Sequence, residues 1–199
     1  MAHSRRWLIV VASASLLAFM GGVFTQEVRS MGGQYENALA EALVHSKDYV
    51  HESQSSIRQI LQGDDESATR QGLHALAADL SAAGRLMRII AELDPLHSES
   101  WSTMHSALLM AVHTVQQVEA ELTDDRGLTE AGGQQIRRVS RLLQHIDRAL
   151  PSTVTENARP KVRLDDEMLQ QAAEEAWDFE HAQQILSGQG ASHSPIWVE

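Results

Sequence analysis

The chain has 199 residues, few aromatic residues (5%), no cysteine and a formal net charge of −11. This length suits one domain with a modest core, or an array of long helical hairpins. The negative charge argues against a nucleic-acid-binding protein, which needs a clustered basic surface, and the missing cysteines exclude a disulfide framework and thiolate metal sites. Abundant Ala, Leu, Gln and Glu favour helices over a β-sandwich.

The first element is an uncharged apolar stretch from Trp7 to Phe24, preceded by Arg5 and Arg6. Its length of about 18 residues is close to the roughly 20 that a helix needs to cross the hydrocarbon core of a bilayer. Bulky Val23 and Phe24 stand where a cleavable signal has small residues. A retained anchor is therefore preferred to a signal that is removed.

This stretch predicts a single-pass bacterial membrane protein. We expect a short cytoplasmic segment (1–6) and a transmembrane anchor (7–25), with the rest of the chain outside the cytoplasm, because positive charge is denser before the apolar stretch than after it. Two alternatives are a twin-arginine export signal and a buried helix of a soluble protein. The buried helix would need a large apolar partner, which the remaining sequence does not offer.

Downstream, apolar residues recur in steps of three or four, which predicts four amphipathic helices. The first runs from about residue 27 to 62 and ends at GDDES (63–67), whose acidic residues are cap candidates for the second. The second ends near Leu93, before Pro95; the third follows a cap at Ser98 and ends at TDDRG (123–127). The fourth follows a cap at Thr129 and ends at Pro151.

Four such helices joined by short turns bury all their apolar faces most simply as an antiparallel bundle, so we expect an all-α fold. The expected bundle covers 27–150. A polar linker (151–163) then leads to an acidic amphipathic helix (164–186), capped by Asp165 or Asp166, and a disordered tail (187–199).

The acidic helix contains no Lys or Arg, whereas the fourth helix presents Arg137, Arg138, Arg141 and Arg148. Opposite charge favours docking of the acidic helix on the fourth helix. Solvent-screened ion pairs contribute only about 0–1 kcal/mol each, so apolar packing must decide whether the two helices dock. The residues expected to pack are Met168, Leu169, Ala172, Ala176 and Trp177. Trp101 of the third helix and Trp177 are expected as core or inter-helix anchors.

The acidic helix admits two interpretations: a solvated face, or a docking surface for a protein partner. The tail sequence PIWVE is a second candidate for a linear binding epitope. The predicted partner-binding residues are Asp165, Asp166, Glu167, Glu174, Glu175, Trp177, Asp178 and Trp197.

No pattern predicts catalysis or metal binding. The chain has 10 histidines, but pairs such as His105 and His113 lie too far apart on one helix to converge on an ion. Neither a Gly-x-Ser-x-Gly elbow nor a glycine-rich phosphate loop is present in the sequence. We expect no catalytic residue, no metal ligand and no cofactor, and therefore a protein that is not an enzyme.

A family resemblance begins at QYENALAEALVHSKDYV (34–50), about ten residues beyond the apolar stretch. Together with LeuAspProLeu at 93–96 and VRLDDEMLQQA at 162–172, it resembles the anchored helical region of spore-germination proteins of the YpeB type. The resemblance covers residues 5 to about 185 and rests on four motif residues, Tyr35, Ala38, Leu39 and Glu41. The PepSY-type repeats into which that family continues are not in this sequence.

The resemblance implies a membrane-anchored helical region that holds or stabilises a cell-wall (spore cortex) lytic enzyme, a peptidoglycan hydrolase, in sporulation and germination. We therefore expect an extracytoplasmic bundle that acts by protein–protein interaction in or near the membrane, with self-association left open. The alternative is a ligand-sensing four-helix bundle of the chemoreceptor sensor type that acts through a membrane partner.

Overall fold

The computed structural model describes residues 33–63, 65–122, 127–151, 154–156, 159–161 and 164–186. The predicted cytoplasmic segment (1–6), the anchor (7–25) and the tail with Trp197 lie outside these residues. Within the described ranges, no helix combines the length and apolar character that crossing a membrane requires. The chain divides into two compact units, 1–38 and 39–199, and the bundle described below belongs to the second.

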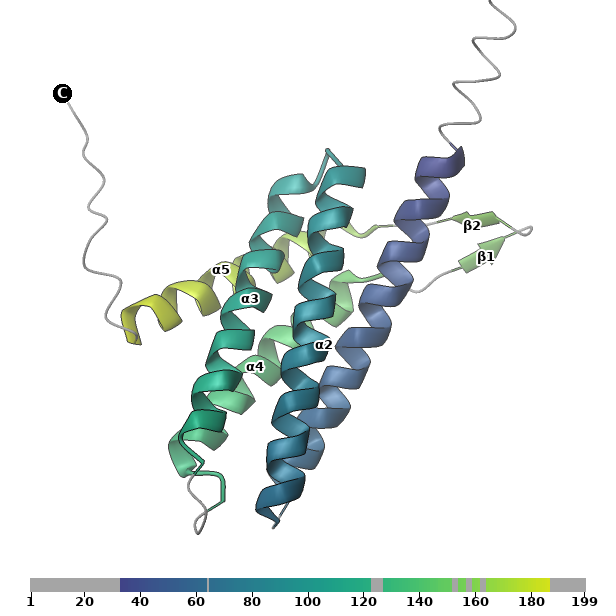
Figure 1. Cartoon of the computed structure of the whole chain (residues 1–199). Helices are drawn as coiled ribbons and strands as arrows, with labels where there is room; N and C mark the ends of the chain where they lie inside the picture. The colour runs from purple at the N-terminus through teal and green to yellow at the C-terminus, as the bar shows by residue number, and fades with distance from the viewer. Residues whose placement is uncertain are drawn as a thin grey trace, which may run out of the picture. The chain divides into compact units, whose positions relative to one another are not determined.

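The described residues are mainly helical (Figure 1). A first helix covers residues 33–62, and the others are α2 (Glu66–Leu93), α3 (Ser98–Ala120), α4 (Glu130–Ala149) and α5 (Asp166–Leu186). The prediction of an all-α helical bundle is confirmed, and within these ranges each expected helix has a counterpart.

Side chains cap three of these helices as the sequence predicts. Asp65 accepts hydrogen bonds from two backbone N–H groups at the start of α2, Thr129 accepts one at the start of α4, and Asp165 accepts two at the start of α5. The predicted cap at Ser98 is wrong: Ser98 is the first residue of α3, and His97 takes the cap position without a side-chain cap bond. The reason is the tight turn after Asp94, where the His97 backbone N–H already donates to the Asp94 carbonyl.

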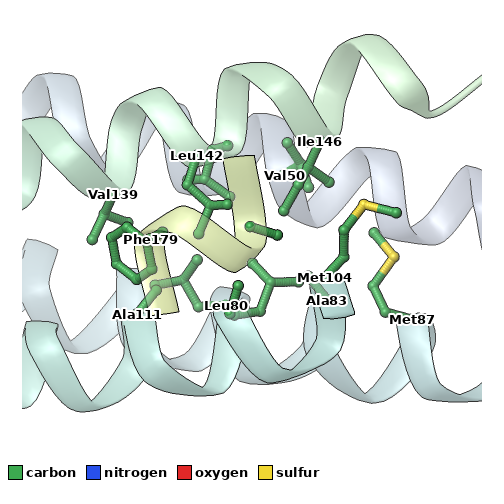
Figure 2. Packing of buried hydrophobic residues seen from close by; sticks show 14 of the residues in the cluster. Val50, Leu80, Ala83, Met87, Met104, Ala111, Val139, Leu142, Ile146 and Phe179 are labelled. Atoms are coloured by element: carbon green, nitrogen blue, oxygen red, sulfur yellow. The ribbon is translucent and has the colours of Figure 1, made fainter. Parts of the chain in front are cut away.

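The core lies between the helices of the bundle (Figure 2). α2 and α3 run antiparallel and pack along their lengths across the Asp94–His97 turn (Figure 1). Trp101 is fully buried, which confirms the prediction that it is a core residue. The largest fully buried side chains are Trp101, Leu43, Ile57, Ile60, Leu73, Leu76, Leu80, Met87, Ile90, Met104, Leu108 and Ile136.

α5 packs against both α3 and α4 and closes the core (Figures 1 and 2). Its buried stripe confirms three of the five predicted packing residues, Leu169, Ala172 and Ala176. The prediction is wrong for Met168 and Trp177, which are 39% and 53% exposed. Phe179, which is 8% exposed, takes the aromatic position in the core instead, because it continues the buried spacing of three and four residues.

Two short strands occupy the segment predicted as a linker. β1 (Val154–Glu156) and β2 (Arg159–Lys161) pair antiparallel, with Val154 opposite Lys161 and Glu156 opposite Arg159. This hairpin connects the end of α4 with the segment that leads into α5.

Candidate functional site

The predicted partner-binding residues within the described part of the chain lie on α5 or directly before it. Asp165, Asp166, Glu167, Glu174 and Asp178 are exposed, and Glu175 is half-buried. They are spread along the helix rather than gathered in a convergent cluster, and Asp165 caps that helix. The acidic residues thus give the surface its charge, and a further feature is needed to define a contact point.

Trp177 supplies that contact point. Its ring stacks on the His181 ring, with centroids 3.9 Å apart and an interplanar angle of 24°. Both residues are exposed, and Ile185, one turn further along, is 71% exposed. Residues 174, 177, 178 and 181 share one helix face, so carboxylates flank the stacked rings. The outer face of α5, defined by Glu174, Trp177, Asp178, His181 and Ile185, combines negative charge with apolar surface.

The start of α5 is fixed to the α2–α3 turn through His97. One ring nitrogen, Nδ1, lies 2.8 Å from Asp94 Oδ2, and the other, Nε2, lies 3.3 Å from Asp166 Oδ1. Asp94 also accepts a hydrogen bond of 2.9 Å from the buried Trp101 Nε1. These contacts join the start of α5 to the α2–α3 turn.

A groove of about 350 Å³ is lined by residues of α4 and α5, which pack against each other. Arg138 and Arg141 line it from α4, and Glu175 and Asp178 line it from α5. Among the described side chains, no ion pair joins these two walls. Gln183 also lines the groove, is only 6% exposed, and its Nε2 finds no hydrogen-bond partner among the described residues.

No protein family, curated protein or solved structure matches this chain. The resemblance to proteins of the YpeB type therefore remains a proposal based on the sequence. Of its motif residues, Tyr35 is 60% exposed, Ala38 and Glu41 are exposed, and Leu39 is partly buried against the core.

Two histidines join α2 to α3. His105 Nδ1 lies 2.7 Å from the Gly84 carbonyl oxygen and joins α3 to α2, and His74 Nε2 lies 2.9 Å from Glu119 Oε1 across the same two helices. Where the structure describes the chain, no group of three or more His, Asp or Glu side chains is placed to hold a metal ion.

Sequence reasoning missed two features of the site. It did not identify His181, whose four-residue spacing from Trp177 was the available signal. It also did not identify Gln183, because a glutamine is usually exposed and only the packing of α5 on α4 buries this one.

Proposed function

We propose that this chain is a non-enzymatic helical-bundle protein that binds a protein partner through the outer face of α5. The observation that carries the proposal is the exposed Trp177, held against His181 and flanked by carboxylates. The partner we expect presents a basic surface around an apolar pocket that accepts the indole ring.

Energetic reasons support this choice of contact. Tryptophan is enriched among the few interface residues that supply most of the binding free energy, and truncating such a residue costs about 2 kcal/mol or more. The stack on His181 already restricts the Trp177 ring, so less side-chain entropy is lost on binding. The surrounding carboxylates accelerate encounter with a basic surface and disfavour acidic ones.

The place of action and the kind of partner come from the sequence. We propose that residues 7–25 anchor the chain in the cell membrane, with the N-terminus cytoplasmic and the bundle outside the cytoplasm. The partner then lies in or near the membrane, and the YpeB-type resemblance makes a peptidoglycan hydrolase of the spore cortex the first candidate.

Crosslinking and pull-down from native membranes test the proposal with the full-length chain and two variants. Trp177→Ala removes the contact point, and Ile89→Ala is the matched control, since Ile89 is a 45% exposed apolar residue on α2. We expect Trp177→Ala to lose the crosslinked partner and Ile89→Ala to retain it. Equal recovery with Trp177→Ala would contradict the proposal.

Location is tested separately by adding protease to spheroplasts that contain the full-length chain. We expect external protease to cleave the bundle while cytoplasmic control proteins stay intact. If the bundle resisted external protease, the proposed orientation would be contradicted. The partner-binding proposal would still be tested separately by the crosslinking experiment.

A second candidate function is ligand sensing through a membrane partner. The groove between α4 and α5 favours it, because a sensor needs a site lined by polar groups that are free to bind a ligand. The bundle would then report ligand occupancy to a membrane protein rather than hold an enzyme.

A further inference from the structure

The groove between α4 and α5 has walls of opposite charge. Arg138 and Arg141, three residues apart on α4, face Glu175 and Asp178, three residues apart on α5. In a pair of helices that merely docked by charge, these groups would bond to each other. Here the space between them is open, so each wall can bind a group of the opposite sign.

The inner part of the groove adds an apolar surface. Phe179 is 8% exposed and Gln183 is 6% exposed, and both line the groove. The Gln183 Nε2 group has no hydrogen-bond partner in the part of the chain that the structure describes. That nitrogen has almost no accessible surface, so it is enclosed by protein and does not contact the space of the groove.

We propose that this groove binds a small zwitterion with a carboxylate and an ammonium group, namely a free α-amino acid. The carboxylate accepts hydrogen bonds from the arginine wall, and the ammonium group donates to the acidic wall. The side chain of the ligand packs on Phe179. A volume of about 350 Å³ lies within the range of small-molecule sites, near its lower end.

Ligands with only one charge fit less well. A simple anion meets the carboxylates of Glu175 and Asp178, and a simple cation meets the two arginines. In each case one wall is left without a partner while like charges are brought close, which disfavours binding. The arrangement therefore selects for both charges in one small molecule.

The proposal concerns binding alone and does not require that the outer face of α5 recognise a partner. It supplies the ligand class that the sensing alternative needs. Binding without any effect on a membrane partner would leave this proposal intact and remove the sensing alternative, so the two can fail separately.

The test is isothermal titration calorimetry of the full-length chain in detergent with each standard amino acid. For the amino acid that binds, the N-acetyl derivative removes the ammonium group and the amide derivative removes the carboxylate. We expect each derivative to bind at least about tenfold more weakly, because each leaves one charged wall unpaired. Absence of binding by every amino acid, or equal binding by the derivatives, would overturn the proposal.

Substitutions of the residues that line the groove test whether the amino acid binds there. Arg138→Gln and Arg141→Gln should each weaken binding by about tenfold or more. Arg148→Gln is the matched control, since Arg148 is an exposed arginine on the same helix outside the groove. Binding that is unchanged in the groove variants, or lost equally in Arg148→Gln, would refute the site, provided that circular dichroism shows all variants folded.

Discussion

Two glycines of α2 give opposite predictions for the same substitution to alanine. At Gly84, an added Cβ would have Leu108 Cβ as its nearest contact, at 3.6 Å, which is an ordinary van der Waals separation. At Gly72, it would lie 2.8 Å from Ile60 Cγ1, which is too close. Both glycines are buried in the helix interior, so alanine gains about 0.8–1.0 kcal/mol of helix propensity at either site, and sterics decide the sign.

The magnitudes follow from these contacts. Gly84→Ala should raise the free energy of unfolding by about 0.5–1 kcal/mol. Gly72→Ala has the same gain, but overpacking costs about 1–3 kcal/mol because Ile60 is only 1% exposed and its Cγ1 is near the backbone. The two variants should therefore differ by about 1–3 kcal/mol, and each kcal/mol corresponds to about 2–4 °C in Tm for a chain of this size.

Urea unfolding followed by far-UV circular dichroism measures this difference. The Ile60→Ala background is the decisive control: with the obstructing side chain removed, Gly72→Ala should become stabilising. If Gly72→Ala stabilises the unmodified chain as much as Gly84→Ala does, the close approach between the first helix and α2 is not present and the reasoning fails.

Three further predictions concern polar groups. Burial, and to a smaller extent the nearby Glu52 carboxylate, raise the pKa of Asp79 above its ordinary value of 3.8. Ionisation of Asp79 therefore destabilises the fold as the pH rises through that raised pKa. Asp79→Asn should raise Tm at neutral pH, and this gain should vanish below about pH 3.8. Asp94→Ala leaves the buried Trp101 N–H without its acceptor and should lower the free energy of unfolding in urea by about 1–3 kcal/mol. This loss should be smaller in a Trp101→Phe background, and equal losses in both backgrounds would contradict the hydrogen bond between these residues. Thr129→Ala removes the cap of α4 and should cost about 0.5–2 kcal/mol, whereas Thr129→Ser should cost much less.

The helix boundaries were predictable because local chemistry sets them. Pro95 and Pro151 disfavour helix at the preceding residues, and Asp65, Thr129 and Asp165 each satisfy backbone N–H groups that no helical partner can reach. These effects depend on a few neighbouring residues, so they can be read without knowing the tertiary contacts. The misplaced cap at Ser98 fits the same view, because the turn before α3 is stabilised by backbone bonds instead.

The orientation of α5 was harder to predict, because its apolar residues lie on two faces. Leu169 and Phe179 point into the core, whereas Met168, Trp177 and Ile185 are exposed. Periodicity alone does not show which of the two faces is buried in the core. The buried stripe is completed by small alanines, which let α5 approach α3 and α4 closely, and that fit depends on helices elsewhere in the chain.

The groove could be predicted only in part. The basic face of α4 and the acidic face of α5 are visible in the sequence, and they correctly suggest that these helices lie together. That the charged walls stay apart, and that Gln183 is buried between them without a partner, depends on the distance between two packed helices. Neither composition nor spacing fixes that distance.

α5 links the two proposed binding events. Trp177 belongs to its outer face, and the next residue, Asp178, lines the groove. A ligand ammonium group at Asp178 would neutralise a carboxylate that flanks Trp177 and so weaken attraction to a basic partner. Linkage then requires the partner to weaken ligand binding by the same factor. Measuring the ligand affinity with and without the partner, or the partner affinity with and without the ligand, therefore tests both proposals.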